Sequence, residues 1–214
     1  MQQRSVVPEI LDRLPANDPE AVRSRRDLRR INFLMGNERW VLKNLRHLAT
    51  APASTITELG AGDGHLSRQI AHHFPASQLH AWDLSPPPET LPTNLKWHQT
   101  DIFDDLSSIQ GDVLIANLFL HHFEKDALQQ IGTIAAQFST LLFCEPDRAR
   151  LPHFHGRLLH PCINRVTKHD LHVSIDAGFS AGEIAEFLGL NPSVWKIREQ
   201  SNWRGSRRVV GCRI

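Results

Sequence analysis

The chain has 214 residues, of which 41% are hydrophobic and 22% are charged, so it falls in the ordinary globular range and can bury a sizeable core. Lysine and arginine (24) nearly balance aspartate and glutamate (23), which argues against a wholesale polyanion binder of the histone type. No run approaches the roughly 18 apolar residues of a membrane span, and the first residues lack the apolar core of a signal peptide. We therefore expect a cytoplasmic protein of one α/β-sized domain, with three isolated, reduced cysteines.

The first 50 residues are expected to form an N-terminal helical cap. Asp18, followed by Pro19 and Glu20, is a typical helix start, and Gly36 is a typical end. A second helix is expected over residues 38–48. Three arginines share one face of the first helix, namely Arg23, Arg26 and Arg30. They either face solvent or form a basic docking surface.

From residue 54 onward, short apolar runs alternate with helical patterns. An amphipathic helix that bears Leu66, Ile70 and Phe74 follows the first run, and a further helix is expected over residues 125–137. The expected strands cover residues 55–59, 78–82, 95–98, 112–116 and 139–144. Strands that alternate with helices predict an α/β fold with a doubly wound, mostly parallel sheet.

The last third of the chain follows a different pattern. Ser180 and Glu183 form a capping box that predicts a helix over residues 180–190. Two strands, 194–199 and 207–213, follow with a turn between them. We expect them to form an antiparallel hairpin at one edge of the sheet.

The segment from Glu58 to Gly64 is the most informative part of the sequence. It lies between a predicted strand and a predicted helix, and its alternating glycines, Gly60, Gly62 and Gly64, allow a sharp turn and the close approach of a ligand. The dinucleotide fingerprint would need a further glycine at position 65, where this chain has histidine. An NAD site is therefore disfavoured, while a tight turn without any ligand stays open.

Two acidic positions follow at the ends of the next two predicted strands. Asp83 ends the second strand, where its carboxylate can accept hydrogen bonds from vicinal ribose hydroxyls. Asp101 and Ile102 follow the third strand and offer a carboxylate for an exocyclic amine and an apolar side chain for a purine face. Since parallel strands end at one edge of the sheet, these positions predict a crevice that fits adenosine.

This combination resembles the class I S-adenosylmethionine-dependent methyltransferases. The residues that carry the resemblance are E-x-G-x-G-x-G at 58–64, the acidic segment at 80–85, Thr-Asp-Ile-Phe at 100–103, and the fourth strand running into Ala116 to His122. The terminal hairpin also matches the family's topology. The resemblance covers about residues 50–214 and implies a Rossmann-like seven-stranded sheet in a domain over 51–214.

The resemblance implies S-adenosylmethionine as the cofactor and gives roles to individual residues. Gly60, Gly62 and Gly64 would approach its methionine portion, and Glu58 would orient the glycine loop and the amino group indirectly. Asp83 would bind the ribose, with Leu84 beside it in the same motif. Asp101 and Ile102 would hold the adenine. Asn117 would contact the methionine end through its backbone.

The expected acceptor is a lipophilic small molecule that bears an oxygen. An insert at about residues 148–175 occupies the position where this family builds its acceptor pocket, and it mixes apolar residues with arginine and histidine. The chain has Asn117-Leu118-Phe119-Leu120 where methyltransferases of planar nitrogens carry Asn-Pro-Pro-aromatic. Methylation of oxygen is therefore favoured over methylation of a base or an amide nitrogen.

If the acceptor is a hydroxyl, a base near its proton helps, and histidine has the appropriate pKa. His169, with Asp170 beside it, is the preferred candidate base, and His121 and His122 are alternatives at the mouth of the crevice. The adjacent histidine pairs lack ligand-type partners at helical spacing, so no metal site is expected.

Two alternative functions stay open on the sequence. The first is RNA or protein methylation, with docking through the arginines of the N-terminal helix and through Arg204, Arg207, Arg208 and Arg213, although nucleic acid is not the expected partner. The second is a module that binds S-adenosylmethionine without turnover. The sequence does not predict the oligomeric state.

Overall fold

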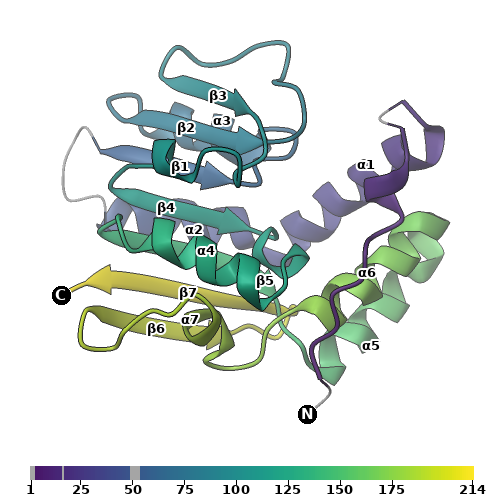
Figure 1. Ribbon diagram of the computed structural model, residues 1–214. Coiled ribbons are helices and arrows are strands. Elements are labelled where there is room, and N and C mark those ends of the chain that lie inside the picture. Colours follow the sequence, from purple (N-terminus) through teal and green to yellow (C-terminus); the bar gives the residue numbers. More distant parts are fainter. Residues whose placement is uncertain (1–2, 16, 49–53) are drawn as a thin grey trace.

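The computed structural model describes residues 3–15, 17–48 and 54–214. Among these residues, a seven-stranded sheet has the order β3-β2-β1-β4-β5-β7-β6 (Figure 1). The strands are β1 (Thr55–Leu59), β2 (Gln78–Asp83), β3 (Leu95–Gln99), β4 (Val113–Asn117), β5 (Thr140–Pro146), β6 (Trp195–Ser201) and β7 (Ser206–Arg213). The first five strands are parallel, and β7 runs antiparallel to both β5 and β6. This sheet confirms the predicted doubly wound fold and its C-terminal hairpin.

Helices cover both faces of the sheet (Figure 1). On one face lie α2 (Asn37–Leu48) and α3 (His65–His73), and on the other lie α4 (Lys125–Ala135) and α7 (Glu183–Phe187). Strand β4 is buried between two hydrophobic clusters: Leu114 packs into the cluster with α4, and Ile115 into the cluster with α2 and α3. Because successive side chains point to opposite faces, a strand buried on both faces is apolar throughout, which is the pattern that identified it.

A lobe of three helices lies beyond the carboxyl ends of the parallel strands (Figure 1). It contains α1 (Pro19–Met35), α5 (Arg150–Leu159) and α6 (Arg165–Ala177). Asp18 caps α1 by accepting a hydrogen bond from the backbone of Glu20, and left-handed Gly36 ends the helix, as predicted. A buried hydrogen bond from Thr167 of α6 to Ser24 of α1 ties the two helices together. The expected insert at 148–175 is thus mainly a pair of helices, joined by the short helix η4 (His160–Cys162).

Residues 3–15 form an N-terminal strap that crosses this lobe. The strap includes a short helix, η1 (Leu11–Arg13), but is otherwise extended or irregular. Arg4 donates hydrogen bonds to the carbonyl oxygens of Ala177 (2.8 Å) and His121 (3.1 Å). The backbone of Ser5 donates to that of Asp176. These bonds attach a segment at the start of the sequence to residues more than 100 positions later.

Two helices differ from the expectation in their packing or their length. Helix α2 contributes Val41 and Leu45 to the core beneath the sheet, so it belongs to the sheet layers and not to a separate cap. The expected boundary between residues 50 and 51 lies outside the described residues. The helix predicted over 180–190 is shorter, because left-handed Gly182 sets its start at Glu183.

Among the described residues, no helix combines the length and the apolar character that crossing a membrane requires.

Candidate active site

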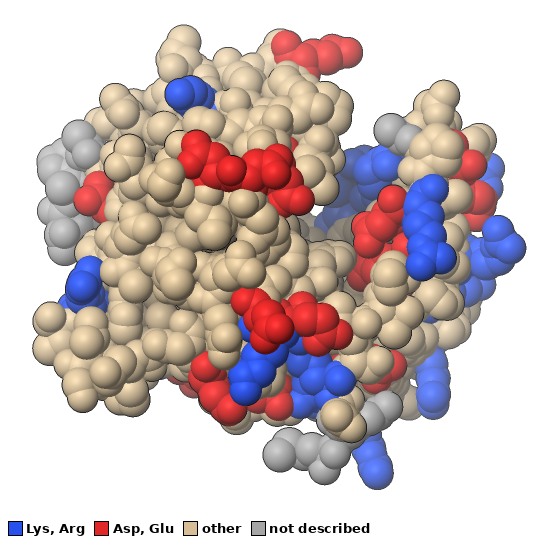
Figure 2. Space-filling model, in the orientation of Figure 1, with Lys and Arg blue, Asp and Glu red and all other residues tan. Residues whose placement is uncertain are grey.

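A cleft of about 1390 Å³ opens at the carboxyl ends of β1, β2 and β4, beneath the helical lobe. Figure 2 shows the molecule hollowed between the sheet-bearing body and this lobe. Strand β1 lies between β2 and β4, so the strand order reverses at this point. Ligands of open α/β sheets bind in the crevice at such a switch point.

The glycine loop after β1 forms one wall of the cleft. Gly60, Gly62 and Gly64 all have positive φ angles, of 69°, 60° and 70°. A Cβ atom on Gly60 would lie 2.1 Å from the ring of Phe119, whereas one on Gly62 would meet nothing within 4 Å. Gly60 and Gly62 line the cleft, and Gly64 caps α3 behind it. Of the three loop glycines, Gly62 therefore combines a left-handed backbone with open space for a ligand.

Four carboxylates surround the glycine loop and line the cleft: Glu38, Glu58, Asp63 and Asp83. Glu58 is buried and accepts a hydrogen bond from Ser67 Oγ. Burial, together with the charges of Glu38, Asp83 and Asp63, raises the pKa of Glu58 to about 8. In this acidic wall, Asp63 pairs with Arg29 at 3.0 Å, and Glu58 is mostly protonated in the free protein. Glu38 and Asp83 therefore supply most of the charge that favours a positively charged ligand.

Asp83 ends β2 and points at the glycine loop. Its carboxylate accepts hydrogen bonds from the backbone N–H groups of Gly62 and Ser85, each at 2.7 Å. A carboxylate has about four lone-pair sites, so acceptor capacity remains for a ligand hydroxyl. Leu84, the next residue, is 70% exposed and also lines the cleft.

The end of β4 supplies two unusual features. Asn117 lines the cleft, and its buried Oδ1 has no hydrogen-bond partner among the described residues. Leu118 follows with a φ of 57°, a strained value for a residue with a side chain. Backbone strain of this kind and buried polar groups without partners both concentrate at functional sites. Asn117 thus offers an acceptor to a ligand N–H or O–H group.

The structure does not bring Asp101 and Ile102 to the lining of the cleft. Ile102 is only 4% exposed and packs in the core cluster that contains Trp82. Asp101 accepts a hydrogen bond from the backbone of Phe103, two residues later. The strand-end rule placed both residues at the correct edge of the sheet, but the turn after β3 directs Ile102 into the core.

The far end of the cleft is polar. It is formed by η3 (Leu120–His122), which follows β4, and by Glu9 and Asp12 of the N-terminal strap. The buried carboxylate of Glu145 accepts hydrogen bonds from the backbone of Phe119 (3.0 Å) and Leu120 (2.8 Å). These bonds hold the short helix in place.

His121 lies between two carboxylates. Its Nδ1 is 2.8 Å from Glu145 and its Nε2 is 3.8 Å from Glu9. Burial opposes the charged form, but the hydrogen bonds and charges of Glu145 and Glu9 outweigh it and raise the pKa of His121 to about 9. Burial and the neighbouring His121 lower the pKa of His122 to about 4. In this environment His121 holds its proton at neutral pH, which does not suit the role of general base expected from the sequence.

His169 and Asp170 do not line the cleft. The His169 side chain is 49% exposed and lies 2.9 Å from the Asp170 carboxylate. Asp170 is fully buried and accepts hydrogen bonds from the backbone of Ile10 (2.8 Å) and Leu11 (2.9 Å). Asp170 anchors the N-terminal strap, so the structure assigns a structural contact where the sequence suggested the partner of a base.

The wall of the cleft under the lobe is mostly apolar. Its apolar residues include Leu28, Ile31, Leu34 and Met35 of α1, Pro152, Leu158 and Leu159 of α5, Leu171 and Ile175 of α6, and Trp203 of the turn between β6 and β7. The cleft thus has an acidic end at the glycine loop, an apolar chamber under the lobe, and a polar end at η3.

No protein-family model matches the chain, and no curated protein matches it. Solved structures do match. The plantazolicin methyltransferase BpumL in complex with SAH has a TM-score of 0.72 at 13% sequence identity, over 92% of this chain and 91% of that chain. This chain has the class I methyltransferase fold. Magnesium protoporphyrin IX methyltransferase (ChlM) from Synechocystis PCC 6803 with bound SAH has a TM-score of 0.58 at 14% identity, over 84% of this chain and 83% of that chain.

A third matching structure, that of the pyocyanin biosynthetic protein PhzM, has a TM-score of 0.60 at 16% identity. It is matched over 92% of this chain and 60% of that chain. With identities this low, the comparisons establish the architecture, and the chemistry depends on the residues of the cleft.

In this fold, the C-terminal arginines form hydrogen bonds and ion pairs with other residues of the same chain. Arg204 and Arg208 donate to the last carbonyl oxygens of α1, at Leu34 (3.0 Å) and Met35 (2.7 Å). Arg207 pairs with Asp147 and Glu199, each at 2.6 Å, and Arg213 donates to the carbonyl of Ala136. The C-terminal part of the docking surface considered from the sequence therefore makes contacts within the chain, whereas Arg23 and Arg30 of α1 remain largely exposed.

Sequence reasoning missed Glu9 and Asp12 in this fold. Glu9 lies in an irregular segment and Asp12 in the three-residue helix η1, and neither belongs to a periodic pattern or a motif, so no local signal points to the cleft. Their placement depends on the anchors at Asp170 and Ala177, which are distant in the sequence.

Proposed function

We propose that this chain is an enzyme that transfers a methyl group from S-adenosylmethionine to a lipophilic small molecule, on oxygen. The observation that carries the proposal is the continuity of one cleft, in which the acidic wall at the glycine loop meets the apolar chamber under the lobe. When bound, S-adenosylmethionine supplies an electrophilic methyl group on a positively charged sulfur. The residues of the chain then need to hold the two reactants in line, which accounts for much of the rate enhancement in such displacements.

The residues present fit this cofactor. It carries cationic groups, and Glu38, Glu58, Asp63 and Asp83 form the wall that it would contact. The unpartnered Oδ1 of Asn117 fits the cofactor's ammonium group, and the open space over Gly62 fits its methionine portion. The SAH bound in structures of BpumL and ChlM supports the same choice.

Asp83 is the proposed ribose ligand and Leu84 the proposed apolar contact for the base. The Asp83 carboxylate is held by two backbone N–H groups, so its orientation is set before a ligand arrives. Asp101 and Ile102 keep an adenine role only if the turn after β3 moves, because neither lines the cleft.

The acceptor site is proposed in the apolar chamber. The walls from α1, α5 and α6 suit a lipophilic body, and the polar end at His122, Glu9 and Asp12 suits an oxygen substituent. The named neighbours support a small acceptor, since they include a plantazolicin methyltransferase and a magnesium protoporphyrin IX methyltransferase. The cytoplasmic location expected from the sequence remains a prediction.

Calorimetric titration with SAH, S-adenosylmethionine and NAD tests the cofactor. We expect micromolar binding of the two sulfur nucleosides and none of NAD. Asp83→Ala should weaken binding by roughly 10- to 150-fold, the equivalent of about 1.5–3 kcal/mol for a lost charged hydrogen-bond partner. Asp101→Ala is the matched control and should bind like the wild type. Absence of binding, or an equal loss in both variants, would refute the proposed site.

A methylation screen tests the acceptor class. Phenols, quinols, polyketides and acyl compounds would be compared with amines, proteins and RNA, with transfer measured from labelled S-adenosylmethionine. We expect transfer to a lipophilic oxygen compound. Robust methylation of RNA or protein, with none of any small molecule, would overturn the acceptor proposal. Cofactor binding without any transfer would favour a non-catalytic binding module.

A further inference from the structure

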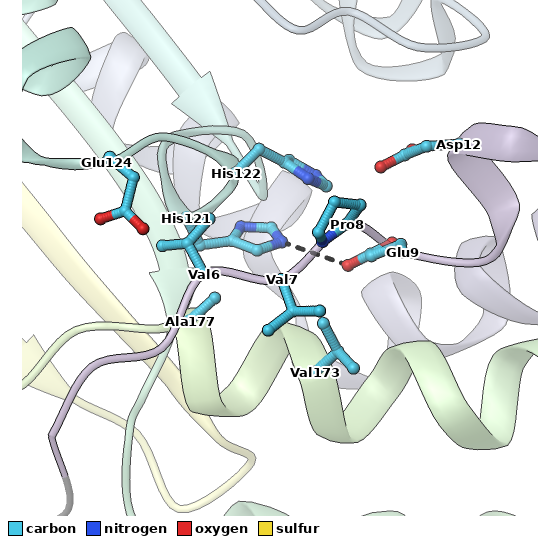
Figure 3. A pocket seen from close by; sticks show the side chains of 10 residues that line it. All are labelled: Val6, Val7, Pro8, Glu9, Asp12, His121, His122, Glu124, Val173 and Ala177. Atoms are coloured by element: carbon cyan, nitrogen blue, oxygen red, sulfur yellow. Dashed lines mark ion pairs between the residues drawn. The ribbon is translucent and has the colours of Figure 1, made fainter.

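Three ligand-type side chains converge at the polar end of the cleft. They are Glu9 of the N-terminal strap and His121 and His122 of η3, and one ligand atom of each lies within 4.8 Å of the others (Figure 3). Glu9 and His121 are buried, and His122 is partly exposed. The sequence predicts no metal at the His121-His122 pair because no ligand stands near it in the chain, but the strap supplies Glu9 from more than 100 residues away.

His121 is already oriented as a metal ligand would be. Its Nδ1–H donates to the carboxylate of Glu145, and that carboxylate is itself fixed by backbone N–H groups of η3. The other ring nitrogen, Nε2, then points at Glu9, at 3.8 Å, and the proton that it shares with Glu9 in the metal-free protein is released when a metal binds. Metal-binding histidines usually donate their second ring N–H to a carboxylate or carbonyl, which sets the tautomer and raises the basicity of the ligating nitrogen.

We propose that Glu9, His121 and His122 bind a divalent transition-metal cation of the zinc type. Metal–ligand distances of about 2.0–2.1 Å place neighbouring ligands of a tetrahedral site about 3.3 Å apart. The separation of Glu9 and His121 is within about half an ångström of this value. Two imidazoles and one carboxylate suit zinc, cobalt or ferrous iron better than magnesium or calcium, which prefer oxygen ligands.

Space and charge at the site favour a cation. A cavity of about 310 Å³ adjoins the three ligands, and Asp12 lines it as a second carboxylate of the strap (Figure 3). Three protein ligands beside an open cavity is the arrangement of catalytic zinc sites, which keep one position for water or substrate. The second histidine cluster of the lobe is different. His153 and His160 each contact the ring of His172, and the carboxylate of Asp176 lies 3.2 Å from Nε2 of His153. The ligand atoms therefore do not converge on one point as they do at Glu9, His121 and His122.

The proposed metal site lies next to the chamber in which the acceptor is proposed to bind. Glu9, Asp12, His121 and His122 line both this cavity and the main cleft, so an open coordination position would face the chamber. This part of the inference rests on the proposed function: the acceptor would be a phenol or an enol, held through its oxygen at the metal. Metal binding itself does not depend on that function.

Titration of the metal-stripped, full-length protein with Co²⁺, followed by visible absorption, tests the site directly. We expect one cobalt per chain with the absorption bands of a low-coordinate N/O site, displaced by Zn²⁺. His122→Ala should weaken cobalt binding at least 100-fold, while His169→Ala and His172→Ala should leave it unchanged. Zn²⁺ should raise the melting temperature of the wild type and not that of His122→Ala.

Two further measurements distinguish loss of the metal site from loosening of the strap and from failure of the proposed function. Glu9→Gln should also weaken cobalt binding, and its melting temperature without metal reports any loosening of the strap. Calorimetry of the metal-free protein with SAH tests the cofactor site independently, so that the proposed function and the metal site fail separately. Absence of stoichiometric cobalt binding, or binding that survives His122→Ala, would overturn the metal site and leave Glu9, His121 and Glu145 as an ion-pair network.

Discussion

Replacement of Glu58 by glutamine tests the link between the acidic wall and the cofactor. Burial raises the pKa of this carboxyl to about 8, so the free protein holds it about nine-tenths protonated at pH 7. A cationic ligand in the same cleft favours the ionised form. Binding should therefore release close to one proton at pH 7 in the wild type and none from this site in Glu58→Gln.

The raised pKa of Glu58 also determines how the affinity for SAH depends on pH. Below the pKa of about 8, the ionised fraction of Glu58 rises about tenfold per pH unit. If the ligand requires the ionised form, affinity for SAH should increase by up to about tenfold between pH 6 and pH 7, or about 1.4 kcal/mol. The range stops at pH 7 because a free amino group starts to lose its proton near pH 7.7–8.0.

The assay is calorimetry from pH 6 to 7 in two buffers with different ionisation enthalpies, which counts the protons released. Asp83→Asn is the control, since it should bind more weakly but keep the pH slope of the wild type. A wild-type affinity that does not change with pH, or an equal slope in Glu58→Gln, would refute the reasoning. In the absence of ligand, the raised pKa also predicts that the wild type loses stability relative to Glu58→Gln as pH rises from about 4.5 to about 8.

Three further substitutions test the framework of the site by urea unfolding. Gly60→Ala should lower the free energy of unfolding by about 2–5 kcal/mol, because the new side chain is strained at a positive φ and also overlaps the Phe119 ring. The same substitution should abolish SAH binding. Asp170→Asn should cost about 1–3 kcal/mol and speed proteolysis of the N-terminal strap, which it anchors through two backbone N–H groups. Arg207→Met should cost about 3–5 kcal/mol, because it leaves the largely buried carboxylate of Asp147 without its charged partner and with only the hydrogen bond from Ser201 among its side-chain contacts to described residues.

Each of these substitutions has a milder counterpart elsewhere in the chain. Gly62→Ala meets no atom and should show only about 1–2 kcal/mol of backbone strain. Asp101→Asn, on an exposed turn, should leave the strap intact. Arg213→Met removes one exposed hydrogen bond and should cost under about 1.5 kcal/mol. Each counterpart should cost less unfolding free energy than the substitution that it matches. An equal cost in both would contradict the contact proposed for the first substitution.

Local patterns predicted most of the sheet and one half of the site. The strand at 112–116 was identifiable because a strand buried on both faces is almost continuously apolar. Strand β1, a short run with β-branched residues that ends at the glycine turn, was predicted at its observed bounds. Glu58, the glycine loop and Asp83 were identifiable because a turn between a strand and a helix, and the end of the next strand, meet at one edge of any parallel sheet.

Only the tertiary structure decided the other half of the site. Glu9 and His121 come within 3.8 Å because Asp170 binds the strap, and that contact joins residues about 160 positions apart. Because Asp170 makes this contact, it anchors the N-terminal strap, whereas the sequence suggested it as the partner of a catalytic base. Periodicity and capping report on neighbours along the chain, within a helical turn or a strand. Packing between distant segments depends on the summed fit of the whole fold. The sequence alone therefore identified Glu58 and Asp83 of the acidic wall and the histidines after β4, whereas only the folded chain brought Glu9 and Asp12 to those histidines.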